Sequence, residues 1–327
     1  MPCRTSNCGC FMALGHRCDN HAMPVSPTTH ELTVRNGDVS LAGSLWLPPD
    51  PVGVTVLMHP GSGPSDRDND VFFPPIREQL LDSGVAVSSF DKRGVGESSS
   101  RWQDAAIEEQ ASDAVECLEA LRADTSLGGP VGLYGHSQGG WVVIDAAARC
   151  SHVAFVVTSS GPGVTPGEQE RWATRVYMAK AGIPESEIEE VGRYYDRVIS
   201  MMRSGVGLAD AREQLEAEGF PQAFETLSLP VLPDDEADWQ LMAAMIDYDP
   251  RPALERLEVP ILAAFGAEDP IVPVEESIAV FREAVRPDLL QVEVFEGAGH
   301  RLEIGDPPAF VDGYFELLAS FIVRAGI

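Results

Sequence analysis

The stretch PVGLYGHSQGG, residues 130–140, places a short apolar run directly before a G-x-S-x-G pattern formed by Gly135, Ser137 and Gly139. The run is typical of a buried strand, and the residues after it predict a helix over 138–149. At such a strand-to-helix turn the flanking glycines let the two elements approach, and the strained serine projects its hydroxyl above the sheet. Ser137 is therefore a candidate nucleophile, because the motif stands in the structural setting that it requires.

On both sides of this turn, short β-rich runs alternate with longer helical patterns. Such alternation predicts an α/β fold of parallel strands, joined by right-handed crossovers and covered by helices on both faces. The stretch 31–48 differs, because it is typical of a hairpin that turns at Asn36–Gly37. The other strands are expected within residues 53–61, 85–94, 130–137, 152–161, 259–270 and 289–300, and the helices over 73–83, 104–122, 138–149, 274–285 and 308–323.

The alternation stops between about residues 162 and 250, where the pattern is helical throughout. An all-helical insertion between two strands predicts a cap over the carboxyl edge of the sheet, the edge at which open α/β sheets bind ligands. We therefore expect an α/β core at residues 30–161 and 251–327, and a helical cap at 162–250. Residues 1–29 are expected to be a disordered or non-native extension.

A serine hydroxyl needs a general base, and that base needs an acid to orient it. After a nucleophile at this type of turn, the acid precedes the histidine along the chain. Only His152 and His300 follow Ser137, and His300 stands in the glycine-rich loop EGAGH after the last expected strand. His152 precedes a core strand and is expected to cap it. For the acid we expect Asp269, which stands in a tight loop after the preceding strand, with the adjacent Glu268 as an alternative.

The oxyanion hole needs two N–H donors, one of which follows the nucleophile at the start of the helix and here belongs to Gln138. The second is expected in the glycine-rich stretch HPGSGPSDRD, which follows the first central strand. Pro60 lacks an N–H group, so Ser62 or Gly61 is the candidate donor. The His59 ring is expected to brace this loop rather than to transfer protons.

Five motifs, HPGSGPSDRD, FDKRGVGES, GHSQGG, GAEDPIVP and GAGH, occur in an order and spacing that resembles the α/β-hydrolase superfamily. The resemblance extends from about residue 31 to the C-terminus and is strongest to serine hydrolases related to prolyl-oligopeptidase-like esterases and acyl hydrolases. It implies the α/β-hydrolase fold, with a mostly parallel eight-stranded sheet and a helical cap inserted after strand 6. The sequence departs from the usual pattern at Pro60, which leaves the second oxyanion donor open between Ser62 and Gly61.

By this resemblance, Asp66, Arg67 and Asp68 form a structural charge cluster near the site. Asp91 and Arg93 are expected to pin the turn after the fourth strand. The alternative role for Arg67 or Arg93 is to bind a carboxylate of the substrate.

The expected activity is hydrolysis of a small or medium carboxylic ester through an acyl-enzyme, with a thioester or an amide as alternative substrates. This chemistry requires no metal and no organic cofactor. The alternatives are C–C bond hydrolysis or acyl transfer by the same three residues, since fold does not fix function, and a non-catalytic ligand receptor. The expected partner is a small apolar ester or acyl substrate, for which the cap offers these candidate side chains: Trp172, Tyr177, Met178, Met242 and Met245.

The chain is strongly acidic, with a formal net charge of −28, and its only lysines are Lys92 and Lys180. Such a surface repels polyanions, which argues against nucleic acid and anionic membranes as partners. No stretch approaches the roughly 18 consecutive apolar residues that a membrane helix needs. The sequence leaves the oligomeric state open.

The cysteines give a further, weaker signal. Cys117 and Cys150 stand in helical patterns and are expected to be small core residues. With no sign of disulfides, a reducing compartment and a cytoplasmic location are expected. A crowded group near the start could be drawn as a zinc site but lacks paired C-x-x-C spacing, which favours an extension upstream of Met23; its members are Cys3, Cys8, Cys10, His16, Cys18 and His21.

Overall fold

The structure is a computed structural model that describes residues 26–227 and 232–326. The cysteine-rich start of the chain, with its alternative zinc site, lies outside these described residues. Eight strands form the central sheet: β1 (Thr28–Asn36), β2 (Val39–Leu47), β3 (Thr55–His59), β4 (Ala86–Phe90), β5 (Val131–His136), β6 (Val153–Ser159), β7 (Ile261–Gly266) and β8 (Leu290–Phe295).

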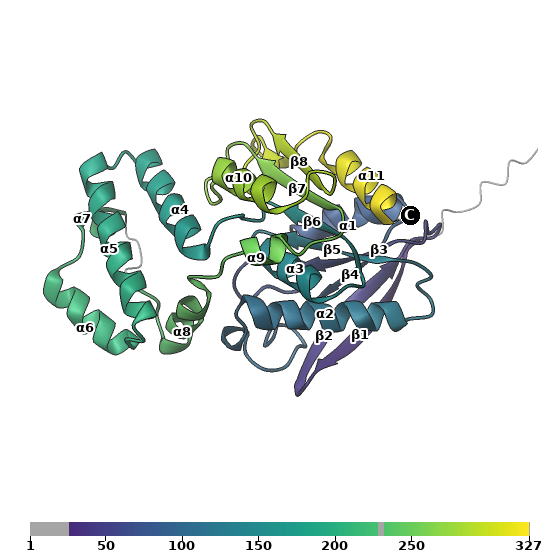
Figure 1. Ribbon diagram of the computed structural model, residues 1–327, viewed down its shortest axis with the longest axis horizontal. Coiled ribbons are helices and arrows are strands. Elements are labelled where there is room, and N and C mark those ends of the chain that lie inside the picture. The colour runs from purple at the N-terminus through teal and green to yellow at the C-terminus, as the bar shows by residue number, and fades with distance from the viewer. Residues whose placement is uncertain (1–25, 228–231, 327) are drawn as a thin grey trace, which may run out of the picture.

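The spatial order of the strands is β1–β2–β4–β3–β5–β6–β7–β8 (Figure 1). β1 pairs antiparallel with β2, and β2 pairs antiparallel with β4, whereas the other neighbouring pairs are parallel. The predicted mostly parallel, eight-stranded sheet is confirmed. Because β3 and β5 to β8 run in the same direction, the loops that follow them meet at one edge of the sheet.

Helices cover both faces of the sheet, as predicted (Figure 1). One face packs against α1 (Phe73–Asp82) and α11 (Tyr314–Gly326). The other packs against α2 (Ile107–Ala123), α3 (Gln138–Arg149), α9 (Arg251–Leu254) and α10 (Val274–Ala284). Successive strand residues alternate between the two cores: Leu133 of β5 packs on the α2–α3 side and Tyr134 on the α1–α11 side. Burial on both faces explains the continuous apolar runs of the central strands.

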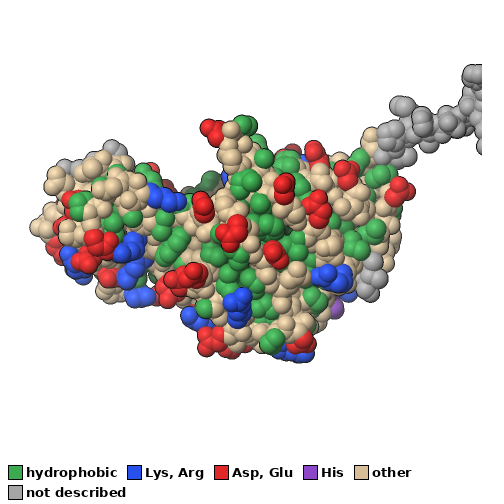
Figure 2. Space-filling model, turned by 90° about the horizontal axis from the view of Figure 1, so that it is seen from above, with side chains coloured by type: hydrophobic (Ala, Val, Ile, Leu, Met, Phe, Trp, Pro, Cys, Tyr) green, Lys and Arg blue, Asp and Glu red, His purple; other side chains and the backbone are tan. Residues whose placement is uncertain are grey.

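Between β6 and α9 the described residues form five helices: α4 (Pro166–Lys180), α5 (Glu185–Arg203), α6 (Leu208–Glu218), α7 (Gln222–Leu227) and α8 (Glu236–Met245). We call α4 to α8 the cap helices. They make a lobe beside the sheet region (Figure 1), with its own apolar core around Met178 and Trp239. The space-filling view shows an indentation between this lobe and the sheet region (Figure 2).

The first strand begins earlier than the predicted domain boundary. β1 starts at Thr28, inside the range 1–29 that we expect to be an extension, because Thr28 pairs with Leu47 of β2. The hairpin turns after Asn36, as the sequence indicates, and Gly37 there has a φ of 58° that favours glycine.

Two helices begin later than predicted. A 3-10 turn, η1 (Trp102–Asp104), precedes α2. The last helix, α11, is preceded by the short antiparallel strands β9 (Glu303–Ile304) and β10 (Ala309–Phe310), and β10 occupies the predicted start of that helix. Among the helices of residues 26–227 and 232–326, none is long and apolar enough to cross a membrane.

Candidate active site

Ser137 stands between the end of β5 and the start of α3, in the turn that the G-x-S-x-G pattern predicts. Its φ of 54° and ψ of −123° are strained for a residue other than glycine, at a cost of about 1–3 kcal/mol. The Ser137 N–H donates to the carbonyl oxygen of Ser159 in β6 at 3.0 Å, which ties the turn to the neighbouring strand. Ser137 thus lies at the carboxyl edge of the sheet, where it lines a cavity.

The glycines of the pattern are required because backbone segments approach closely around the turn. A Cβ atom on Gly135 would lie 2.1 Å from the Gly139 oxygen, and one on Gly139 would lie 2.5 Å from the His59 oxygen. Real Cβ atoms do not tolerate such contacts, so only glycine fits at either position. The start of α3 therefore contacts both the strand before it and the end of β3, and this contact brings the loop after β3 next to Ser137.

Asp269 and His300 come from neighbouring loops, one after β7 and the other after β8. His300 Nδ1 lies 2.8 Å from Asp269 Oδ2, so its N–H donates to a fully buried carboxylate. The second carboxylate oxygen, Oδ1, accepts the N–H groups of Ile271 and Val272 at 2.8 and 3.0 Å. These bonds fix the carboxylate, and the carboxylate fixes the His300 ring. The alternative acid, Glu268, is exposed and makes no hydrogen bond to His300.

The His300 ring lies beside the turn that carries Ser137, since its centroid is 5.0 Å from that of His136. The Ser137 hydroxyl makes no hydrogen bond with a residue that the structure describes. In unliganded serine–histidine sites such bonds are often long and tighten only when a substrate binds. The structure therefore brings Asp269 into direct contact with His300 and places this pair near Ser137.

The loop after β3 passes directly beside Ser137: a Cβ on Gly61 would lie 3.6 Å from Ser137 Cβ. The Gly61 N–H donates to Asn69 Oδ1 at 3.2 Å, so this candidate donor is already engaged. Ser62 lines the same cavity as Ser137, and no described residue accepts its N–H. Gln138 opens α3, so its N–H has no partner within the helix. This geometry favours Ser62 with Gln138 over Gly61 as the donor pair.

A buried lysine that sequence reasoning missed links the two segments that hold these donors. Lys92 Nζ donates to the Gly61 oxygen and, at 2.9 Å, to Gln138 Oε1. Burial lowers the pKa of Lys92 to about 7, because the ammonium group loses its hydration. The available signal was its position: one of only two lysines in the chain stands inside the motif FDKRGVGES.

His59 faces the same interior region and lines, with Lys92, a small internal cavity of about 40 Å³. Its Nε2 lies 3.3 Å from Gln110 Oε1. Burial, with the nearby Lys92 charge, lowers the pKa of His59 to about 3, so the ring stays neutral near pH 7. A buried, neutral ring held by Gln110 supports the expectation that His59 braces the loop.

The side chains of Asp66, Arg67 and Asp68, which we expect to form one charge cluster, pair with residues elsewhere in the chain or shape the loop. Arg67 binds Asp91 rather than its neighbours in sequence, with Nη2 and Nε 2.7 and 3.1 Å from the two carboxylate oxygens. Asp68 pairs instead with Arg77 of α1 at 2.6 Å. Asp66 Oδ1 accepts the Asp68 N–H at 3.1 Å and so shapes the loop.

Arg93 is likewise held by a carboxylate. Its Nε and Nη2 donate to Asp113 of α2 at 2.7 and 2.8 Å, and little of either side chain remains exposed. The turn after β4 is therefore attached to α2. Because both this guanidinium and that of Arg67 are engaged, the geometry favours structural roles over binding of a substrate carboxylate.

A cavity of about 160 Å³ opens onto Ser137, and we call it the Ser137 cavity. Its core side carries Ser62 and Gln138, and its cap side includes residues of α4 and α8. Sequence reasoning missed Gln169 and Glu170, two polar residues of α4 that line it. The sequence does not indicate which face of α4 lines the Ser137 cavity, because that face depends on how the cap helices pack against the sheet region.

The structure separates the five candidate side chains of the cap. Met242 and Met245 line the Ser137 cavity. Tyr177 is 52% exposed and lines a second cavity of about 350 Å³, which we call the outer cavity. Trp172 lines a different hollow between α4 and α5, and Met178 is fully buried in the cap core. The expectation is thus corrected for Trp172 and Met178, because the helical period of α4 turns them toward α5.

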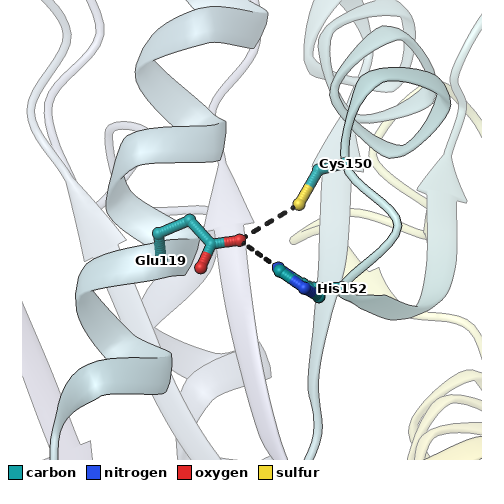
Figure 3. A group of neighbouring side chains, drawn as sticks. All are labelled: Glu119, Cys150 and His152. Carbon is teal, nitrogen blue, oxygen red and sulfur yellow. Dashed lines mark hydrogen bonds and ion pairs between the residues drawn. The ribbon is translucent and has the colours of Figure 1, made fainter.

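One group of potential metal ligands lies away from Ser137. Glu119 Oε1 accepts a hydrogen bond from Cys150 Sγ at 3.3 Å and lies 2.7 Å from His152 Nδ1 (Figure 3). The group sits where β6 begins, at the opposite edge of the sheet from Ser137. A metal would require the Cys150 thiolate, and burial raises the pKa of this thiol. The hydrogen bonds account for the arrangement, and His152 here attaches the start of β6 to α2.

Comparisons with known proteins agree with this architecture. Residues 56–312 match the model of the alpha/beta hydrolase family. The esterase EstD of Thermotoga maritima is 24% identical over 291 residues, which are 86% of this chain and 62% of EstD. The chain thus spans less than two thirds of the length of that curated relative.

Solved structures with a similar fold include the Pyrococcus furiosus esterase Pf2001, with a TM-score of 0.58 and 16% identity over 91% of this chain and 90% of that one. The proline iminopeptidase of Mycobacterium smegmatis gives a TM-score of 0.58 and 18% identity, over 90% and 98% of the two chains. Identities this low show a shared fold alone. The family model, however, covers more than half of the chain and includes Ser137, Asp269 and His300. This chain belongs to the alpha/beta hydrolase family.

Proposed function

We propose that this chain hydrolyses a small or medium carboxylic ester through an acyl-enzyme formed on Ser137. His300 takes the hydroxyl proton as Ser137 attacks the carbonyl, and the N–H groups of Ser62 and Gln138 bind the oxyanion. His300 then gives that proton to the leaving alcohol. In the second half of the reaction it takes a proton from the water that attacks the acyl-enzyme. Asp269 orients the imidazole and stabilises the imidazolium throughout.

The observation that carries this proposal is the Asp269–His300 hydrogen bond beside a strained serine. Asp269 Oδ1 is occupied by two backbone N–H groups, so Oδ2 alone remains to receive His300 Nδ1–H. With the proton held on Nδ1, the other ring nitrogen, Nε2, is the acceptor that a serine proton requires. The name of the relative EstD, an esterase, supports ester hydrolysis over the other reactions of the family.

The Ser137 cavity supports the proposed substrate size. Its volume of about 160 Å³ lies below the range of about 300–1,000 Å³ that drug-sized ligands occupy. Met242 and Met245 give it a flexible apolar wall, which suits a small acyl or alcohol group. A thioester or an amide would react by the same steps. C–C bond hydrolysis and acyl transfer remain the alternative proposals, and a cytoplasmic location remains a prediction.

The proposal is tested by p-nitrophenyl ester hydrolysis, from acetate through decanoate, with wild type and Ser137→Ala side by side. We expect wild type to turn over the shorter esters and Ser137→Ala to lose about a thousandfold or more in kcat, as removal of a serine nucleophile should cause. The matched control is Ser320→Ala, which removes an exposed hydroxyl from α11 and should keep full activity.

Two other results would contradict the proposal in different ways. Retained activity in Ser137→Ala would show that Ser137 is not the nucleophile. An inert wild type whose Ser137 still reacts with a fluorophosphonate would show a competent nucleophile with the wrong substrate class. Incubation with competing alcohols would then test acyl transfer, because a transferase forms a new ester where a hydrolase forms the free acid.

A further inference from the structure

The Ser137 cavity contains a carboxylate that the proposed hydrolysis does not use. Glu170 of α4 is its charged lining residue, and its side chain makes no hydrogen bond or ion pair with any described residue. The nearby cations of the same helix are already paired: Arg171 binds Asp196, and Arg175 lies 2.6 Å from Glu185. Glu170 is thus left without a counter-charge beside the candidate nucleophile.

A second acceptor lies next to this carboxylate. Gln169 lines the same cavity, and its Oε1 atom is buried without a hydrogen-bond donor in the described structure. A buried acceptor without a donor costs about 1–3 kcal/mol. Gln169 Oε1 therefore lacks a donor, whereas the exposed Glu170 carboxylate lacks a counter-charge. A ligand that brings both a donor and a positive charge would satisfy the two groups.

Aromatic and apolar surface surrounds the two acceptors. Glu170 also lines the outer cavity, which includes Tyr177 and Tyr195 and reaches the Pro270–Ile271 segment beside Asp269. Burial raises the pKa of Tyr195, and the Glu170 charge contributes to this shift, so the carboxylate lies close to that ring. Carboxylates together with aromatic rings are the groups that bind substituted ammonium ions. Lys180 also lines the outer cavity, but it forms no ion pair with Glu170.

We propose that Glu170 and Gln169 form a subsite for a positively charged group, a substituted ammonium, carried by the ester substrate. Glu170 supplies the counter-charge and Gln169 Oε1 accepts a hydrogen bond or an ion–dipole contact from the same group. The subsite lies at the junction of the Ser137 cavity and the outer cavity, because Glu170 lines both. This inference rests on the proposed function, since it needs Ser137 to hydrolyse esters.

The test compares substrates that differ in charge but not in shape. On the alcohol side, acetylcholine (the acetate ester of choline) is paired with 3,3-dimethylbutyl acetate, in which carbon replaces the quaternary nitrogen. On the acyl side, the p-nitrophenyl ester of 4-(trimethylammonio)butyrate is paired with that of 5,5-dimethylhexanoate. For each pair the ratio of kcat/KM, cationic over neutral, is measured at about 0.15 M salt, where surface charges act only over about 8 Å.

We expect wild type to prefer the cationic member of one pair by about twofold to fivefold, the range for an exposed ion pair. The ratio should fall to about one in Glu170→Gln and below one in Glu170→Lys. The control is Glu190→Gln, which removes an exposed carboxylate of α5 outside both cavities. It should keep the wild-type ratio and so separate the subsite from the general attraction of an acidic surface. Thermal melting checks that each variant is folded.

The outcomes distinguish the two proposals. If the neutral esters are hydrolysed but neither pair shows a cationic preference that depends on Glu170, the subsite is overturned while ester hydrolysis stands. If the ratio falls equally in Glu190→Gln, the preference belongs to the whole acidic surface and the subsite is again overturned. If neither these esters nor the p-nitrophenyl series from acetate to decanoate is hydrolysed, the proposed function fails, and the subsite proposal fails with it. If that series is hydrolysed but no ester of either pair is, the subsite alone is overturned.

Discussion

The loops of the sheet and the helices of the cap both line the Ser137 cavity, but they hold their side chains in different ways. On the sheet side the backbone decides: Ser137 has a φ of 54°, and two N–H groups fix Asp269. On the cap side packing decides: Met245 lines the cavity, whereas Met178 is buried in the cap core. Substitutions on the sheet side should therefore change the rate of hydrolysis, whereas substitutions on the cap side should change the selectivity among esters.

The largest expected effect comes from the orienting carboxylate. Asp269→Asn should reduce kcat by about a thousandfold to ten-thousandfold, because an amide next to Nδ1 favours the wrong histidine tautomer. Ester hydrolysis at saturating substrate measures this loss. The adjacent Glu268→Gln removes an exposed carboxylate and should leave the rate within about twofold. If Glu268→Gln were instead the slower enzyme, the acid would be Glu268 and the geometric argument would be wrong.

A smaller effect concerns the buried lysine behind the oxyanion segments. The folded-state pKa of Lys92 is lowered from 10.5 to about 7, so above pH 7 the folded chain binds fewer protons than the unfolded chain. Its stability should therefore rise with pH in this window, at up to about 1.4 kcal/mol per pH unit. Between about pH 7 and 9, wild type should gain about 2 kcal/mol in unfolding free energy relative to Lys92→Met.

Urea unfolding at several pH values checks this prediction. The matched control is Lys180→Met, because Lys180 is the other lysine of the chain and is exposed. Lys180→Met makes the same replacement at an exposed position, so it removes one positive charge without changing a buried site. A difference in unfolding free energy between wild type and Lys92→Met that stayed constant across this pH range would contradict the prediction. That result would show that Lys92 is hydrated and not buried behind Gly61 and Gln138.

The smallest effect should separate the methionines of the cap. Met245→Ala enlarges the Ser137 cavity, so the chain-length profile of p-nitrophenyl esters should shift toward longer acids by about tenfold in relative kcat/KM, the low end of the range for one methylene group. Met178→Ala should leave this profile unchanged and instead lower the unfolding free energy by about 2–5 kcal/mol, as for other buried methionines. The same shift in both variants would remove the distinction between cavity wall and cap core.

Much of the sheet could be predicted because its signals are local. Continuous apolar runs give the buried strands, and the helix after Ser137 runs from Gln138 to Arg149 as expected. The glycines of the turn that carries Ser137 are required by close contacts, since a Cβ on Gly135 would meet the Gly139 oxygen. The predicted neighbourhood of Asp269 and His300 follows from parallel strands, since the loops after β7 and β8 must meet at one edge.

The remaining parts depend on contacts between segments far apart in the sequence. Nothing near Lys92 shows that its ammonium group reaches Gly61 and Gln138, because that needs β4, β3 and α3 to be in place. The partner of Arg67 was likewise not predictable, since Asp91 lies on another loop. In the cap, helical periodicity gives the apolar face of α4 but not the neighbour that it covers, so Trp172 could not be placed in advance.

The most direct test of the central claim is to identify the atom that reacts with a serine-directed fluorophosphonate. Wild type is labelled, digested and analysed by mass spectrometry, with Ser137→Ala and Asp269→Asn treated in parallel. We expect one adduct on the peptide that contains Ser137, none in Ser137→Ala and much slower labelling in Asp269→Asn, because the base is then misoriented. An adduct on another serine, or equal labelling rates in wild type and Asp269→Asn, would contradict the assignment of Ser137 as nucleophile and Asp269 as its orienting acid.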